Sequence, residues 1–226
     1  MDKKTYSYLK LKIAIDGPSA SGKSSAAEQL SKLLCYVRIE AGSFYRAVTY
    51  LVLQKYGRPV DQTEPGFDLF LESIDVKVVD GTIVANNKKL KDELRTNSID
   101  AAIGLIAKQP LVRKKVAEFE HRTINSYEGG IVMDGRVIGT VIMPNADIKF
   151  FITASPEVRA ERRNKQQKEL KYEDVLRDIK NRDYEDENRK IDPLKRAEDA
   201  ILLKNDEMSL DETVKFMLEQ IQLKFK

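Results

Sequence analysis

Residues 17–24 place two glycines, a lysine and a serine at the spacing of a loop that binds phosphate. They read GPSASGKS, a full match to the pattern G-x-x-x-x-G-K-[ST]. Gly17 and Gly22 allow backbone angles that turn successive N–H groups into one concavity, and the following helix N-terminus adds partial positive charge. Lys23 can reach the outer phosphates, and the Ser24 hydroxyl can ligate Mg²⁺. The pattern predicts binding of a nucleoside triphosphate but does not indicate where its phosphate goes.

Asp134 ends the apolar run Ile131–Met133 and is a candidate for the carboxylate near Mg²⁺; the alternative is a cap for the next turn. A switch-type GTPase would also need D-x-x-G and N-K-x-D motifs, and neither stands in a suitable place. A mechanical ATPase or helicase would normally have a longer chain and a second acidic residue beside Asp134. Both classes are therefore disfavoured.

Two arginines stand where an acceptor phosphate could bind. Arg46 lies about one turn into a helix after the second predicted strand, and Arg136 lies just past the strand at 131–134. Open parallel α/β sheets bind ligands outside the carboxyl ends of their strands, and guanidinium groups hold phosphate oxygens in pairs. Each arginine alone is more often a surface or salt-bridged residue. Together with the phosphate loop, the pair indicates a second anion site.

A basic helix follows the strand near residue 150. Arg159, Arg162 and Arg163 have the spacing i, i+3, i+4 and share one face, within a stretch that holds five Lys or Arg and one Glu. Such a helix could close over a triphosphate, exclude water and neutralise the moving phosphoryl group. The alternative is a solvated charged helix.

Further along, Arg182, Asp186 and Arg189 have the spacing i, i+4, i+7 and also share a helical face. Arginine can bind phosphate, and a carboxylate can accept hydrogen bonds from ribose hydroxyls. The alternative, at equal weight, is an exposed helix with surface ion pairs.

Short apolar runs alternate with helical segments, which predicts an α/β fold with a parallel sheet and helices on both faces. Residues 60–96 interrupt the alternation, and two β-rich runs around Asp80-Gly81 predict a type I′ hairpin in a small insert. The strands expected in the main sheet lie at 12–16, between 36 and the helix that starts near 43, at 131–134, 147–155 and 200–204. Helices are expected at 24–34, 43–56, 98–127 with a break near Pro110, 156–164, 172–190 and 210–225.

Composition narrows the possible partners. The chain has 226 residues, 39 Lys plus Arg, 36 Asp plus Glu and a net charge of +3, which disfavours general affinity for nucleic acid or membranes. Its one cysteine, Cys35, fits a reducing compartment, and we expect it to pack in the core. No signal peptide or apolar run of transmembrane length is present, so a cytoplasmic location is expected.

Six segments resemble, in order and spacing, the cytidylate kinases of the bacterial type. The resemblance holds from about Lys12 to Val214, and only the first segment is specific by itself. The segments are IAIDGPSASGKSS, EAGSFYRAVTYL, LRTNSIDAAIGLIAKQPLVR, IVMDGRVIGTVIMPNADIKFFITASPEVRAERR, RDYEDENRKIDPL and DAILLKND.

The resemblance implies a P-loop NTPase fold with a parallel five-stranded sheet flanked by helices, forming one nucleoside monophosphate kinase domain over residues 10–226. It implies a core at 10–40, 98–156 and 192–226, a monophosphate-binding region with a β insert at about 41–97, and a short helical lid at about 157–191. The implied reaction transfers the γ-phosphate of ATP to CMP or dCMP with Mg²⁺. The partners implied are these nucleotides, without nucleic acid or membrane, and a monomer is expected.

Site residues follow from the same resemblance, position by position. ATP is assigned to Gly17, Pro18, Ser19, Ala20, Ser21, Gly22, Lys23, Ser24 and Ser25, with Arg159 and Arg163. The monophosphate is assigned to Arg46, Arg113, Arg136, Arg182 and Asp186. The residues expected to act on the transferring phosphate are Lys23, Arg136, Arg162 and Arg189. The metal is assigned to Ser24, with Asp134 contacting it through water.

Three positions depart from the family pattern. Ala41 replaces a Ser or Thr that contacts the acceptor phosphate, and Ser43 is a conceivable substitute. Val137 replaces an Asp, and Gly104 aligns with a Ser; both family residues read the cytosine. A site with fewer hydrogen bonds discriminates less, so we expect relaxed base choice.

Several alternatives stay open at this point. They are a kinase for UMP or another small acceptor, a catalytically weak nucleotide-binding regulator, and a phosphate-loop protein that acts on nucleic acid. His121 is the only histidine and has no neighbouring catalytic residues in the sequence, so we expect it to be structural or to lie at the surface.

Overall fold

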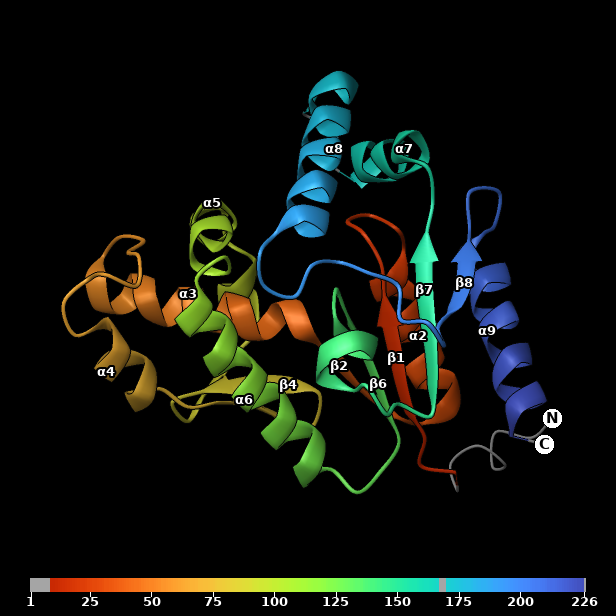
Figure 1. Ribbon diagram of the computed structural model, residues 1–226, viewed down its shortest axis with the longest axis horizontal. Coiled ribbons are helices and arrows are strands. Elements are labelled where there is room, and N and C mark those ends of the chain that lie inside the picture. The colour runs from red at the N-terminus through yellow and green to blue at the C-terminus, as the bar shows by residue number, and fades with distance from the viewer. Residues whose placement is uncertain (1–8, 167–169, 226) are drawn as a thin grey trace. The chain divides into compact units, whose positions relative to one another are not determined.

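The computed structural model describes residues 9–166 and 170–225 (Figure 1). The described chain forms two compact units, one of residues 9–38 and 129–225 and one of residues 39–128. The second unit includes residues 98–128, which the sequence assigned to the core, and the proposed division into core, monophosphate-binding region and lid stays a prediction.

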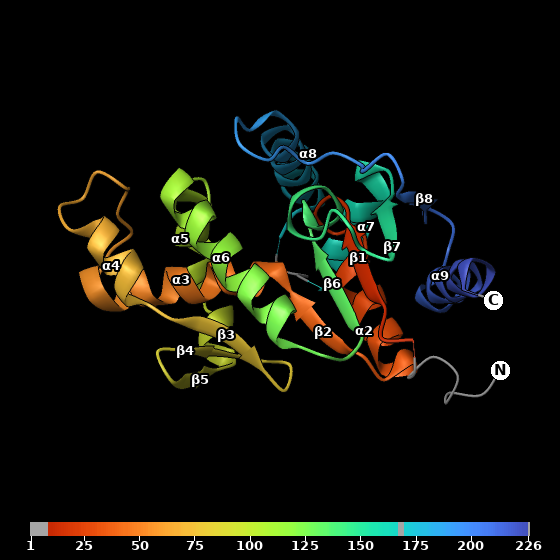
Figure 2. The same cartoon turned by 60° about the horizontal axis from the view of Figure 1, so that its bottom comes forward.

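A five-stranded sheet organises the first unit. Its strand order is β2 (Val37–Glu40), β6 (Ile131–Gly135), β1 (Lys12–Asp16), β7 (Ile148–Thr153) and β8 (Ile201–Lys204). Strand β1 pairs in parallel with both β6 and β7, and β7 pairs in parallel with β8. The prediction of a parallel five-stranded sheet flanked by helices is confirmed. Because β1 and β6 run parallel and are neighbours, the loops that follow them leave the same edge of the sheet (Figure 2).

Helices α2 (Lys23–Leu34) and α9 (Leu210–Lys224) pack against this sheet in one hydrophobic core. Apolar residues recur along one face of each helix, and those of α9 include Val214, Met217 and Ile221 at the spacing i, i+3, i+7. The Ser209 side chain and Glu212 form a capping box that begins α9. Helix α2 ends at Cys35, which has a left-handed backbone with φ 58° and is exposed. The prediction that Cys35 packs in the core is wrong, because the apolar face of α2 ends at Leu34.

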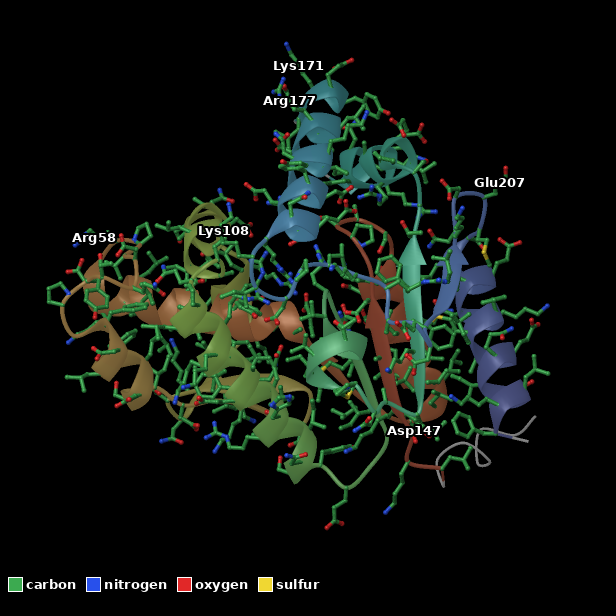
Figure 3. All side chains as sticks on the ribbon, in the orientation of Figure 1. Arg58, Lys108, Asp147, Lys171, Arg177 and Glu207 are labelled. Atoms are coloured by element: carbon green, nitrogen blue, oxygen red, sulfur yellow. The ribbon has the colours of Figure 1, made fainter. Side chains whose placement is uncertain are left out.

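Helices α7 (Pro156–Gln166) and α8 (Tyr172–Asn188) pack on each other around Ala160, Val175 and Ile179. Their other faces are polar, and Lys171 and Arg177 project outward at one end of α8 (Figure 3). This pair of helices spans the stretch that the sequence predicted to be a helical lid.

The second unit combines helices with a small antiparallel sheet. Its helices are α3 (Ala41–Tyr56), α4 (Phe67–Ser73), α5 (Asn97–Ile106) and α6 (Pro110–Ser126), with a 3₁₀ turn η1 (Asp92–Arg95). Strands β3 (Val76–Val79), β4 (Thr82–Ala85) and β5 (Lys88–Leu90) form the sheet in that order. Asp80 and Gly81 both have positive φ, which confirms the predicted hairpin. Asn86 and Asn87 make a second turn with positive φ, so the insert has a third strand that was not predicted.

Candidate active site

The phosphate loop connects the end of β1 to the start of α2, as the sequence predicted. Gly17 must lack a side chain, because a Cβ there would lie 2.0 Å from the Ile152 carbonyl oxygen on β7. Gly22 precedes the helix with φ 86°, a conformation that costs glycine little. The two glycines therefore hold the loop close against β7 and turn it directly into α2. The loop can in this way present backbone N–H groups at a helix N-terminus.

Lys23 is buried at the first position of α2, and its Nζ donates to the Pro18 carbonyl at 3.1 Å. Burial and, next, repulsion from Arg136 lower the pKa of Lys23 to about 7. Three carboxylates oppose this shift and are nearby: Asp134, Asp186 and Asp16. A buried lysine whose charge is incompletely compensated is suited to an anionic ligand.

Ser24 and Asp134 meet beside the phosphate loop. The Ser24 Oγ donates to the Asp134 Oδ2 at 2.6 Å, and the Arg38 Nε donates to the Oδ1 at 3.1 Å. A hydroxyl and a carboxylate are hard oxygen donors of the kind that Mg²⁺ prefers. No group of three His, Cys, Asp or Glu side chains suited to a metal occurs among residues 9–166 and 170–225. The donor set fits a Mg²⁺ ion that keeps several waters and nucleotide oxygens, as this ion usually does.

Asp16 joins the two loops that leave the sheet edge. It is buried at the end of β1, and its two carboxylate oxygens accept from the backbone N–H groups of Ile138 and Gly139 at 2.8 and 2.7 Å. Burial raises the pKa of Asp16, and these two hydrogen bonds oppose the rise. The π-helical turn η2 (Ile138–Ile142) that follows Arg136 is thereby held against β1. The sequence did not single out Asp16, whose partners lie more than 120 residues away.

Three predicted site residues come together in the first unit. The Arg136 Nε lies 2.7 Å from the Asp186 Oδ2, and the Arg189 Nη1 lies 3.4 Å from the Oδ1 of the same carboxylate. Arg189 also donates through its Nε to the Asp192 carbonyl at 2.5 Å. Arg182 lies on the exposed surface of α8 and is not part of this cluster.

Arg159 of α7 is buried rather than solvated. Its Nη1 and Nη2 lie 2.9 and 2.6 Å from the two oxygens of Asp183 on α8. Its Nη1 also donates to the Ser19 carbonyl of the phosphate loop at 3.1 Å, and its Nε donates to the Ala154 carbonyl at 2.9 Å. The alternative of a solvated charged helix is therefore wrong for this residue.

Arg162 reaches the phosphate loop through an intermediate. Its Nη1 and Nη2 donate to the side-chain and backbone oxygens of Asn205 at 3.0 and 2.6 Å. The Asn205 amide in turn donates to the Ser21 carbonyl at 3.0 Å. Arg163 is partly exposed on the same helix. Asp183 on α8 and Asn205 after β8 are partners of these arginines that helical spacing could not indicate.

Arg46 and Arg113 belong to the second unit. The Arg46 Nη1 donates to the Leu94 carbonyl at 2.8 Å, and its Nη2 lies 2.7 Å from the Asp100 Oδ1. Arg113 is buried, with its guanidinium carbon 5.9 Å from the centroid of the Tyr45 ring. Both arginines are thus held in place by neighbours on their own unit.

The three departures from the family pattern also have defined surroundings. Ala41 begins α3, and the Ser43 Oγ donates to Glu40 at 2.9 Å. The Ser43 hydroxyl thus donates its hydrogen bond to Glu40 in this structure. Val137 is buried at the start of η2, whereas a Cβ on the exposed Gly104 would meet open space.

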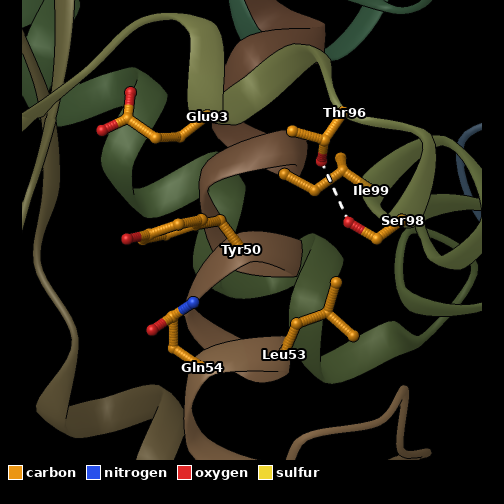
Figure 4. Close-up of a pocket in the computed structure, with 7 residues that line it drawn as sticks. All are labelled: Tyr50, Leu53, Gln54, Glu93, Thr96, Ser98 and Ile99. Carbon is orange, nitrogen blue, oxygen red and sulfur yellow. Dashed lines mark hydrogen bonds between the residues drawn. The ribbon is translucent and has the colours of Figure 1, made fainter.

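A hollow of about 210 Å³ lies elsewhere in the second unit, between α3, η1 and the start of α5 (Figure 4). Its lining is Tyr50, Leu53, Gln54, Glu93, Thr96, Ser98 and Ile99. None of these is a predicted site residue, and the volume is below the roughly 300–1,000 Å³ of typical small-molecule sites.

His121 is exposed on α6. No helix within residues 9–166 and 170–225 is long and apolar enough to span a membrane.

Comparisons with known proteins identify the family of this chain. The family model described as cytidylate kinase matches residues 13–223. A probable cytidylate kinase from Vairimorpha ceranae is 39% identical over 213 residues, covering 94% of this chain and 98% of that protein. The cytidylate kinase of Carboxydothermus hydrogenoformans is 38% identical and covers 93% and 97%. A crystal structure of an uncharacterized protein from Eubacterium ventriosum shares the fold, with a TM-score of 0.53, 13% identity and coverage of 95% and 99%.

The matches extend through the phosphate loop, η2, the lid helices and β8, where the charged residues of the first unit lie. They therefore include the residues that hold the loop as well as the loop itself. This chain belongs to the cytidylate kinase family and is an ATP-dependent phosphotransferase of the nucleoside monophosphate kinase type.

Proposed function

We propose that this kinase transfers the γ-phosphate of ATP to CMP or dCMP and discriminates weakly among pyrimidine bases. The observation that carries the proposal is the clustering of Lys23 with Arg136, Asp134 and Asp186, all of which affect the pKa of Lys23. A residue assigned to the donor phosphates therefore lies close to residues assigned to the acceptor. Such proximity is what direct transfer between two nucleotides requires.

On the donor side, the loop from Gly17 to Ser25 binds the ATP phosphates, and Lys23 follows the transferring phosphoryl group. The phosphates replace the missing counter-charge around the Lys23 ammonium. Ser24 would ligate Mg²⁺ and Asp134 would contact it through water. The ion would supply positive charge that neutralises the donor phosphates.

On the acceptor side, Arg136 and Arg189 hold the attacking phosphate, and Asp186 and Arg182 bind the ribose. The family resemblance assigns Arg46 to the same phosphate and Arg113 to the base. No general base is required, since a monophosphate oxygen is already ionised.

Binding of CMP must compete with the ion pairs of Asp186. Arg136 and Arg189 both contact this carboxylate in the nucleotide-free protein. The acceptor phosphate replaces Asp186 as an ion-pair partner of the two arginines. The Asp186 oxygens can then accept hydrogen bonds from ribose hydroxyls. The lid arginines Arg159, Arg162 and Arg163 supply positive charge over the triphosphate and exclude water.

Weak base discrimination follows from Val137 and Gly104. Val137 offers a buried methyl surface where the family has a carboxylate, and Gly104 offers no hydroxyl. A site with a buried polar group rejects the wrong base strongly, because that base leaves the group without a hydrogen bond. Val137 and Gly104 provide no such group, so the wrong base is rejected less strongly.

The test measures kcat/KM for CMP, dCMP, UMP and AMP with the purified protein. We expect CMP and dCMP to be used best and UMP to follow within about 10- to 100-fold, since a pocket without the base-reading hydrogen bonds discriminates only to about this extent. A CMP preference over UMP far beyond this range would refute weak discrimination. Failure to phosphorylate any monophosphate would refute the proposed function.

Gly104→Ser provides a sharper version of the same test. The added Cβ meets open space, so the variant should fold normally and gain roughly 0.5 kcal/mol in helix stability. The CMP-to-UMP ratio should rise severalfold. Ala101→Ser, which adds the same hydroxyl elsewhere on α5, is the matched control and should leave the ratio unchanged.

A further inference from the structure

The family resemblance gives Arg38 no role, yet this residue contacts Asp134, the carboxylate proposed to lie near Mg²⁺. It lies on β2, which is the neighbour of β6 in the sheet and therefore of Asp134 (Figure 2). The Arg38 Nε lies 3.1 Å from the Asp134 Oδ1, and its Nη1 lies 3.7 Å from the Glu28 Oε2 on α2. Glu28 has a closer cation in Lys32, at 2.6 Å. Asp134 is thus the nearer carboxylate to Arg38, and Glu28 is mainly the partner of Lys32.

Both oxygens of Asp134 are engaged. The Oδ1 accepts from Arg38 and the Oδ2 accepts from the Ser24 hydroxyl at 2.6 Å, while the side chain is only 2% exposed. A buried carboxylate needs a counter-charge. The Arg38 guanidinium supplies that charge within the protein itself, and the pair carries no net charge.

We propose that Arg38 neutralises Asp134 in the nucleotide-free protein, so that this carboxylate retains a divalent cation only together with nucleotide phosphates. The inference rests on the proposed roles of Ser24 and Asp134 toward Mg²⁺. A fixed positive charge on one oxygen of a carboxylate repels a divalent cation near the other oxygen, and partial burial strengthens this repulsion. Nucleotide phosphates add enough negative charge to overcome it.

A direct test measures binding of Mn²⁺, as a spectroscopic substitute for Mg²⁺, to the nucleotide-free protein by electron paramagnetic resonance. Arg38→Gln should bind Mn²⁺ at least tenfold more tightly than the wild type, because the guanidinium charge beside Asp134 that repels the metal ion is removed. Lys32→Gln removes a neighbouring cation whose partner is Glu28, and it should leave Mn²⁺ affinity within twofold of the wild type.

Two further variants locate the effect. Arg38→Met keeps much of the apolar stem without the charge, so it should reproduce the gain, and it carries the test if the glutamine variant folds poorly. Arg38→Gln combined with Asp134→Asn should return to wild-type affinity. Thermal melting and ADP binding check the fold of each variant.

The proposal is overturned if neither Arg38→Gln nor Arg38→Met binds Mn²⁺ more tightly than the wild type. It is also overturned if the gain persists after Asp134 is changed to Asn, because the metal then binds elsewhere. Since no substrate is present, these outcomes are independent of the monophosphate assay that decides the proposed function.

Discussion

Lys23 should take up a proton when a nucleotide binds. Its pKa is lowered to about 7, mainly by burial and by the nearby Arg136. At pH 8, a pKa of about 7 leaves about one Lys23 side chain in ten charged. Bound phosphates supply a counter-charge and raise the pKa toward 10.5, its ordinary value. Each nucleotide should therefore bind with an uptake of about 0.9 proton at pH 8.

The consequence for affinity has a definite sign and size. Between pH 7 and the pKa of the bound state, each unit of pH should weaken binding by up to about tenfold, or about 1.4 kcal/mol. Below pH 7, Lys23 is already charged and this dependence should disappear.

Isothermal titration calorimetry at pH 8 and 9, with a non-hydrolysable ATP analogue in buffers of different ionisation enthalpy, measures the uptake. Lys23→Arg should abolish it, because arginine stays protonated. Lys171→Arg, a change at an exposed position on the lid, is the control. An uptake below about 0.2 proton at pH 8, or an equal uptake in Lys23→Arg, would refute the reasoning.

The same shift predicts a stability effect of known sign. The folded pKa of Lys23 lies below the unfolded value, so the unfolded state binds more protons between pH 7 and 10.5 and stability rises with pH in that window. Lys23→Met has no charge to bury. It should therefore raise the free energy of unfolding by up to about 5 kcal/mol at pH 6 and by little near pH 10.5, as measured by urea titration.

Three further changes test the scaffold of the site. Gly17→Ala should abolish nucleotide binding in ADP titrations, because the new Cβ would lie 2.0 Å from a carbonyl oxygen of β7; near-normal affinity would contradict this. Asp16→Asn should cost about 2–3 kcal/mol in urea unfolding and raise the KM for the monophosphate more than that for ATP, because one backbone N–H of η2 loses its acceptor. Equal changes in the two KM values would indicate a purely structural role. Arg159→Ala should cost about 3–5 kcal/mol by leaving Asp183 unpaired, whereas the exposed Arg177→Ala should cost at most about 1 kcal/mol. Similar losses for these two would mean that the buried pair contributes little.

Much of this protein was predictable from local sequence. The phosphate loop is contiguous, so its glycines, lysine and serine carry their spacing whatever surrounds them. The hairpin at Asp80-Gly81 is equally local, because two residues determine its turn. The strands of the main sheet are short apolar runs, and their alternation with helices already implied a parallel arrangement. The family resemblance rested on the same contiguous segments.

The burial of individual side chains was harder to predict from the sequence. Helical spacing placed Arg159 on a face with Arg162 and Arg163 but could not tell a solvated arginine from one enclosed by Asp183 and the phosphate loop. Cys35 was misjudged for a similar reason, because only the packed helix shows where its apolar face ends.

The order of strands in the sheet determined contacts between residues far apart in the sequence. Strand β2 precedes β6 by about ninety residues in the chain, yet the two are neighbours, and this places Arg38 on Asp134. The end of β1 likewise brings Asp16 to the turn after Arg136. A local pattern specifies which residues can do chemistry. The charge that each one feels depends on partners brought close by tertiary pairing in a poorly solvated interior, where electrostatic interactions are strongest.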